Sequence, residues 1–248
     1  MLPAMSEGTA TDRRHWTQFA REWIAWARSP GHDAFWSYRR TLVDFIGRGT
    51  GEALEVGCGE GRISRELKNL GYRVTATDVV EEFVEAAREA RSAHAYAVAG
   101  ANALPYADGA FDLVVAYNVL MDVEDVPGAL REMRRVLRPG GRVVISLVHP
   151  LRNAGNLEGG GPEAPLVLRG NYYGRRRFEG IEKRDGLQMH FAGWSQPLED
   201  YVAALAQAGL AITALREPVP DQTPCPDRLK PWRRLPLFLW LEARPLAG

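Results

Sequence analysis

The amino-acid sequence predicts a doubly wound α/β domain with a helical extension at its N-terminus and a cap inserted after the fifth strand. Three observations lead to this fold class. An apolar strand at residues 53–56 passes through a glycine turn into a helix. Strands and helices then alternate as far as Val148, which is typical of a parallel sheet covered by helices on both faces. Between Pro150 and Gln196 this alternation stops, so we expect an insertion there.

Composition restricts the classes of partner. The chain has 248 residues with 46% hydrophobic and 25% charged side chains, which fits one globular domain with a substantial core. The formal net charge is zero, which argues against a broad nucleic-acid surface. Cys58 and Cys225 form no metal or redox spacing, so we expect no metal and a reduced, cytoplasmic setting. No apolar run reaches the roughly 20 residues of a membrane helix, so no membrane partner is expected.

The N-terminal 50 residues are rich in tryptophan. Trp16, Phe19, Trp23 and Trp26 recur at spacings of three and four, which predicts one apolar stripe on a helix. A second helix leads to Gly47. The stripe either fastens this helix to the core or forms a lid that covers a ligand and excludes water, and the two roles are compatible.

The glycine turn at residues 57–61 predicts a ligand site. A strand that enters a helix through glycines lets a ligand approach bare backbone at the positive end of the helix dipole. A dinucleotide fingerprint would need glycine where Arg62 stands, and the Gly-Lys-Ser or Gly-Lys-Thr end of a phosphate loop is absent. The remaining pattern, Glu55 followed by Gly57, Gly59 and Gly61, resembles motif I of the class I methyltransferases that depend on S-adenosylmethionine (SAM).

Residues 72–77 form a second expected strand, and Asp78 ends it. Asp78 stands 21 positions after Gly57, close to the roughly 20 expected for an acid that binds two ribose hydroxyls. The alternative role is to cap the helix at residues 79–91, because aspartate is a favoured cap.

The middle of the chain extends the resemblance. Residues 94–99 and 111–117 are expected strands, and the second is apolar enough to be buried on both faces. The stretch LPYADGAFDLVVAYNVL and the later VEDVPGALREMRRVLRPGGRVVIS look like the methyltransferase domain common in small-molecule enzymes, over residues 52–148. In that family an acidic residue often binds adenine where this chain has Gly100, so backbone at Ala101, the Asn102 amide or Leu104 would hold the ring instead.

The C-terminal half supplies the expected cap and last strands. Residues 188–191 alternate in polarity and suggest a small hairpin inside the cap. Arg175, Arg176 and Arg177 would either clamp a carboxylate or phosphate or form a solvated face. A helix starts at Pro197, and strands are expected at 210–215 and 235–241. The resemblance implies a seven-stranded sheet whose last strand is antiparallel, between the fifth and sixth.

The resemblance also implies SAM as cofactor and S-adenosylhomocysteine as product. The candidate cofactor-binding residues are Glu55, Gly57, Cys58, Gly59, Gly61, Asp78, Val79, Ala101, Asn102, Ala103, Tyr117 and Asn118. The candidate catalytic residues are His149 and His190, as proton acceptors with an unperturbed pKa near neutrality, and the hydroxyl of Tyr172. His149 has the alternative role of an ordinary loop histidine. The candidate substrate-binding residues are Trp36, Tyr38, Tyr173, Trp194 and Arg177.

The function expected from these patterns is SAM-dependent methyl transfer to oxygen, nitrogen or carbon of a small molecule, by a monomer or homodimer. In a single domain, residues 1–50 would be a helical lid, 51–149 the SAM-binding core, 150–196 the substrate cap and 197–248 the last helix and strands. Alignment alone can supply roughly 7 to 11 kcal/mol, so a base is optional. Two alternatives remain: a SAM-fold protein that transfers no methyl group, as a cyclase or sensor, and a nucleic-acid methyltransferase.

Overall fold

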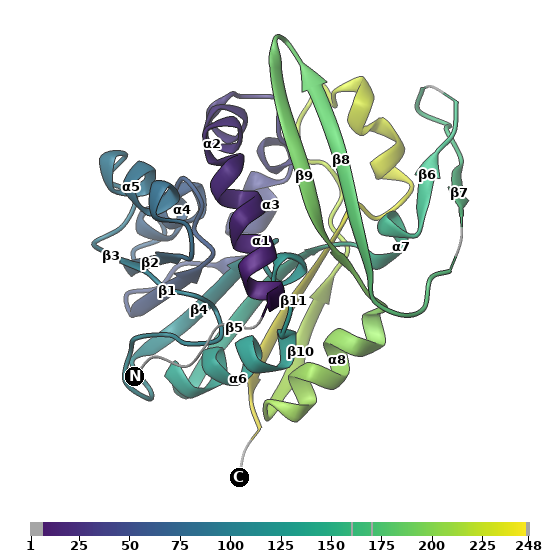
Figure 1. The fold of residues 1–248 in the computed structure, drawn as a ribbon. Helices are drawn as coiled ribbons and strands as arrows, with labels where there is room; N and C mark the ends of the chain where they lie inside the picture. Colours follow the sequence, from purple (N-terminus) through teal and green to yellow (C-terminus); the bar gives the residue numbers. More distant parts are fainter. Residues whose placement is uncertain (1–6, 160, 170, 247–248) are drawn as a thin grey trace.

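The computed structural model describes residues 7–159, 161–169 and 171–246, and its centre is a seven-stranded sheet (Figure 1). The strand order is β10-β11-β5-β4-β1-β2-β3. Its strands are β1 Glu52–Val56, β2 Arg73–Asp78, β3 Ala95–Val98, β4 Phe111–Tyr117, β5 Leu137–Val148, β10 Leu210–Arg216 and β11 Phe238–Pro245. β11 runs antiparallel to both β5 and β10, whereas β1 to β5 pair in parallel. The predicted fold class is confirmed, with its antiparallel last strand.

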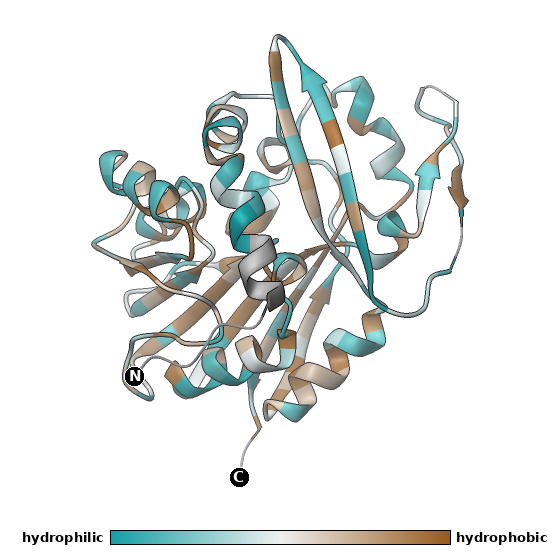
Figure 2. Ribbon diagram, in the orientation of Figure 1, coloured by the Kyte–Doolittle hydropathy of each residue, from teal (hydrophilic) through white to brown (hydrophobic). Residues whose placement is uncertain are grey.

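Helices cover both faces of this sheet because its strands are apolar on both sides. Leu54 and Val56 face the layer that contains α6 (Val126–Val136) and α8 (Leu198–Gln207). Ala53 faces the opposite layer, which contains α3 (Arg39–Ile46), α4 (Arg62–Asn69) and α5 (Glu81–Glu89). Figure 2 shows the central strands as largely hydrophobic, as expected for strands buried on both faces.

The N-terminal stripe forms two helices instead of the predicted single one. α1 spans Glu7–Gln18 and α2 spans Ala20–Arg28. The chain leaves helical geometry at Phe19, where φ is −107° and ψ is 16°. A short 3₁₀ helix, η1 (Ala34–Ser37), connects α2 to α3. No helix among the described residues is both long and apolar enough to cross a membrane.

The segment after β5 contains two hairpins instead of the one predicted. α7 (Pro150–Asn153) leads into the short pair β6 (Gly155–Leu157) and β7 (Leu166–Leu168). The longer pair is β8 (Arg176–Arg184) with β9 (Leu187–Ser195), and it extends beyond the edge of the sheet alongside α2 (Figure 1).

Two shorter elements differ from the predicted loops. The turn after β4 forms η2 (Leu120–Asp122), and the proline-rich segment before the last strand contains η3 (Asp227–Arg233). β11 begins at Phe238 rather than at residue 235, after Pro236, which has no backbone N–H to donate to a sheet.

Candidate functional site

A cavity of about 830 Å³ opens at the carboxyl ends of β1, β2, β4 and β5. β1 and β4 are the neighbours at which the chain order of the sheet reverses, the usual ligand position in open α/β folds. The volume of the cavity lies within the range of roughly 300–1,000 Å³ that is typical of small-molecule sites. The other walls come from α1, α2 and the loop to η1, from α7 and β6, from the β8–β9 hairpin and from η3.

The glycine turn forms the floor of this cavity. Gly57 and Gly59 both line it and both have positive φ values, 71° and 52°. A Cβ atom on Gly57 would overlap the side chain of Val119, and one on Gly59 would lie 3.0 Å from Nε1 of Trp23. The backbone is therefore bare where the cavity meets it, and Trp23 lies close to the turn.

Asp78 fixes the conformation of the turn from the end of β2. Its Oδ2 accepts a hydrogen bond from the Gly59 N–H at 2.9 Å, and its Oδ1 accepts one from the Val80 N–H at 3.0 Å. Burial raises the pKa of this carboxyl to about 6, although these bonds stabilise the charged form. α5 begins at Glu81 without a side-chain cap, so Asp78 binds the turn before the helix. It also lines the cavity, as a ribose-binding acid would.

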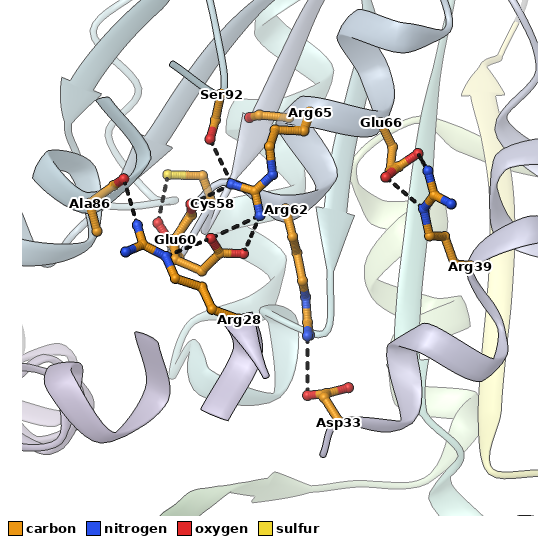
Figure 3. Close-up of polar contacts among 12 residues, drawn as sticks. Arg28, Asp33, Arg39, Cys58, Glu60, Arg62, Arg65, Glu66, Ala86 and Ser92 are labelled. Atoms are coloured by element: carbon orange, nitrogen blue, oxygen red, sulfur yellow. Dashed lines mark hydrogen bonds and ion pairs between the residues drawn. The ribbon is translucent and has the colours of Figure 1, made fainter. Parts of the chain in front are cut away.

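An ion-pair network fastens α2 to the glycine turn (Figure 3). Glu60 is buried, pairs with Arg65 at 2.7 Å, and accepts a longer bond of 3.4 Å from Nε of Arg28 on α2. Trp26 on the same helix is only 2% exposed. α2 is therefore packed onto the core, while Trp16, Trp23 and Trp26 also line the cavity. Both predicted roles of the aromatic stripe are compatible with this arrangement.

Arg62 is a buried cation beneath Trp23 that sequence reasoning did not assign. Its guanidinium carbon lies 4.9 Å from the Trp23 ring and 4.6 Å from the Phe35 ring, and Nη1 is 3.2 Å from Oδ2 of Asp33. Burial opposes the charge of Arg62, but Asp33, Tyr117 and Glu60 together outweigh this effect, so the pKa of Arg62 rises. The available signal was the cation in place of the third glycine of a dinucleotide fingerprint.

The loops after β3 and β4 complete the wall beside the turn. Five of the candidate cofactor-binding residues line the cavity here: Val79, which follows Asp78, and Ala101, Asn102, Tyr117 and Asn118. The Asn102 amide donates to the Asp125 carbonyl at 2.7 Å, and the Asn118 amide oxygen accepts from the Ser146 hydroxyl at 2.8 Å.

Two other predicted cofactor residues lie in the core instead of the cavity wall. Glu55 is 1% exposed and accepts a hydrogen bond from the Ser64 hydroxyl, and burial raises its pKa to about 8. Cys58 is buried as well, and its backbone N–H donates to the Thr77 carbonyl at 2.8 Å. Both positions support the turn from behind.

Gly61 and Ala103 also lie outside the cavity wall. A Cβ atom on Gly61 would overlap Ser92 and approach Ala87, so this glycine permits close packing at the start of α4. Ala103 is exposed and lies outside the cavity wall.

The structure places neither predicted catalytic histidine at the cavity. Nδ1 of His149 accepts from the Leu151 N–H at 3.1 Å and caps α7, while Nε2 lies 3.1 Å from Glu217. Burial lowers the pKa of His149, and Glu217 partly opposes that change. This bond to backbone is the one that the alternative role, an ordinary loop histidine, would make.

His190 and Tyr172 are also engaged elsewhere. Nδ1 of His190 is 2.8 Å from Oε2 of Glu22, and its ring stacks on Phe19 of the N-terminal region at 4.3 Å. The Tyr172 hydroxyl accepts from the Leu198 N–H at 3.1 Å, at the start of α8. His190 therefore packs against Phe19 and Glu22, whereas the next residue, Phe191, lines the cavity.

The predicted substrate residues likewise lie outside the cavity wall. Tyr38 is fully buried against Phe238, with ring centroids 5.0 Å apart, whereas Tyr173 is 65% exposed. Their positions leave neither hydroxyl facing the cavity.

The other three pack against neighbouring side chains. Trp36 packs edge-on against Phe35 at 5.2 Å. Trp194 lies under the Arg177 guanidinium at 5.6 Å, and Nε of Arg177 donates to Glu179 at 3.1 Å.

The far wall of the cavity contains residues that sequence reasoning missed. His32, Arg152, Arg184, Arg228 and Trp232 line it. They come from the loop after α2, from α7, from the end of β8 and from η3. Within the described part of the chain, no group of three or more His, Cys, Asp or Glu side chains could hold a metal ion.

Comparison with known proteins connects this geometry to a family. Residues 54–145 match the family model described as a methyltransferase domain. The malonyl-[acyl-carrier protein] O-methyltransferase of Serratia marcescens is 34% identical over 128 residues, 49% of this chain and 50% of that protein. The demethylmenaquinone methyltransferase of Beutenbergia cavernae is 36% identical over 119 residues, 48% of this chain and 49% of that protein. The chain thus spans about half the length of these curated relatives.

Among solved structures, the chain is similar to an S-adenosylmethionine-dependent methyltransferase from Mesorhizobium loti. The TM-score is 0.65 and the sequence identity 26%, over 86% of this chain and 98% of that one. This similarity extends well beyond the glycine turn and includes most of the fold.

Proposed function

We propose that the protein transfers the methyl group of SAM to oxygen, nitrogen or carbon of a small molecule, because residues 54–145 match a methyltransferase domain and the fold is similar to that of a SAM-dependent methyltransferase. The observation that carries the proposal is the joint position of Gly59 and Asp78 at one end of the cavity. There the bare turn would admit the cofactor, and the carboxylate would accept its ribose hydroxyl hydrogens.

The chemistry of such a reaction asks little of the protein beyond alignment. When bound, SAM supplies a methyl group on a positively charged sulfur. The residues of this chain would bind and orient the two reactants and exclude water from them. Trp16, Trp23 and Trp26 provide apolar surface for excluding water. With His149 and His190 outside the cavity wall, the proposal assigns neither a proton-transfer role.

Relatives favour a small organic acceptor. The names of the two curated relatives specify a malonyl group on an acyl-carrier protein and demethylmenaquinone, neither of which is a nucleic acid. The zero net charge of the chain agrees with an acceptor of this kind rather than with nucleic acid.

Mass spectrometry tests the proposal directly. Purified protein incubated with SAM and an extract of its host should form S-adenosylhomocysteine and one product heavier by a CH₂ unit. Binding of SAM without either product, across extracts fractionated to contain small molecules, would contradict methyl transfer and favour the binding-only alternative.

Gly100 provides a gain-of-affinity prediction. Gly100→Asp should strengthen SAM binding by about tenfold, the effect of one new hydrogen bond to a charged group. The position lines the cavity, a Cβ atom there would meet nothing within 4 Å, and the resemblance places the adenine-binding acid at this point. Calorimetry on Gly180→Asp gives the matched control, because it adds the same charge to the opposite wall, where a Cβ is equally unobstructed. Equal affinities in both variants would show that adenine is held elsewhere.

A further inference from the structure

Three arginines converge on the wall of the cavity opposite the glycine turn. Arg152 belongs to α7, Arg184 ends β8 and Arg228 lies on η3, so three separate segments contribute one cation each. Arg184 and Arg228 are close enough that the charge of one lowers the pKa of the other. The fold has thus assembled a local excess of positive charge.

Aromatic rings and backbone carbonyls orient these cations. The Arg184 guanidinium lies 5.1 Å over the Trp26 ring and donates to the His32 carbonyl. The Arg152 guanidinium lies 5.4 Å over the Trp232 ring.

The remaining two bonds also end on backbone oxygens. Arg152 donates to the Gly155 carbonyl at 3.1 Å, and Arg228 donates to the Gly31 carbonyl. These partners fix the direction of each guanidinium without neutralising its charge.

One carboxylate, Glu182, acts on all three cations, so the cluster keeps a net positive charge. Glu182 is 3.9 Å from Arg184, and its side chain is 57% exposed. Across the described ranges, Arg152 and Arg228 have no carboxylate within ion-pair distance of 4.0 Å. Burial lowers the pKa of both groups, and Glu182, which lies beyond ion-pair distance of each, opposes this change only in part.

Two other arginines on the cavity wall show the contrast. Arg62 is paired with Asp33, and Arg169 is paired with Glu158. The run at residues 175–177, where the sequence suggested a clamp, lies outside the wall. Three arginines and one nearby carboxylate, Glu182, therefore leave an excess of positive charge on this wall.

We propose that Arg152, Arg184 and Arg228 form a subsite for an oxyanion, a carboxylate or a phosphate, carried by the methyl acceptor. The identification of this ligand as the acceptor rests on the proposed function. Guanidinium groups bind carboxylate and phosphate oxygens with two parallel hydrogen bonds, and the rings of Trp26 and Trp232 hold two of these groups in place.

Fluorine NMR on the full chain without SAM tests the subsite. The probes are 4-fluorobenzoate, 4-fluorophenyl phosphate and the neutral 4-fluorobenzamide. At least one of the two anions should bind saturably and at least about tenfold more tightly than the amide, the effect of charge-assisted hydrogen bonds. The tighter anion identifies which oxyanion the subsite takes.

Variants locate the binding. Arg152→Gln and Arg228→Gln, on separate segments, should each weaken anion binding by about tenfold. Arg216→Gln is the control, because Arg216 is exposed on β10 and its side chain donates to the neighbouring Leu215 carbonyl. A variant that loses its cooperative melt is replaced by the corresponding lysine substitution, which keeps the charge and loses the paired geometry.

Three results would overturn the subsite: binding of neither anion, equal binding of the amide, or unchanged anion affinity in both folded arginine variants. The assay needs neither SAM nor turnover. If the protein bound the anion but transferred no methyl group, the proposed function would be wrong and the subsite would stand. If it transferred methyl groups but bound neither anion, the subsite would be wrong and the proposed function would stand.

Discussion

Gly59→Val is expected to abolish SAM binding, with a loss of at least about 100-fold, or about 2.8 kcal/mol. The new side chain would project into the cavity and meet Trp23, whose Nε1 lies 3.0 Å from the position of a Cβ atom. Valine also disfavours the left-handed conformation that the turn requires, with φ of 52°. Titration calorimetry with SAM measures the effect.

Gly109→Val is the matched control for backbone strain. Gly109 has a φ of 63° in the loop before β4, lies outside the cavity wall, and its nearest neighbour to a Cβ is 3.9 Å away. This variant should lose a similar amount of stability and keep its SAM affinity. Unchanged affinity in a folded Gly59→Val protein would show that the cofactor does not approach the turn.

The elements of the sheet were predictable because their signals are local. The alternation of apolar residues and the glycine turn depend on consecutive residues, so β1, α4 and β2 lie where the sequence places them. For the same reason Gly57, Gly59 and Asp78 reach the cavity as expected, since each stands at the end of a strand.

The opposite wall was not predictable from local patterns. It joins α2, α7, β8 and η3, segments whose mutual positions depend on tertiary packing. The proline-rich segment before β11 suggested a crossover, yet it contributes Arg228 and Trp232. His149 does stand at the carboxyl edge of the sheet, but its ring caps α7, a role that no sequence pattern distinguished from catalysis.

The burial of Glu55 beside the turn could not be predicted for a different reason. Glu55 belongs to the motif, but its side chain points into the core towards Ser64, because side chains of a strand alternate between faces. The pairing of β1 with β2 and β4 decides which face of the sheet the Glu55 side chain lies on. This pairing cannot be read from the residues of β1 alone.

Asp78 connects SAM affinity to pH. Burial raises its pKa from 3.8 to about 6, so the carboxylate that would bind the ribose is lost as the pH falls through this value. We expect SAM affinity to fall by about tenfold from pH 7.5 to pH 5, and Asp78→Asn to bind more weakly by about 1 to 3 kcal/mol with a flatter profile. Calorimetry at several pH values on both proteins isolates the contribution of this group.

The contribution of Asp78 to the stability of the protein without cofactor should change with pH in the opposite direction to its contribution to SAM affinity. This difference distinguishes a role in ligand binding from a structural role. Because the folded pKa of Asp78 lies above the unfolded one, its contribution to stability is complete below about pH 4 and is lost as the pH rises through about 6. The difference in unfolding free energy between the wild type and Asp78→Asn should therefore decline across that window, while the difference in SAM affinity grows. If the stability difference declined as expected but SAM affinity were the same in both proteins at every pH, Asp78 would serve only to hold the Gly59 and Val80 amides.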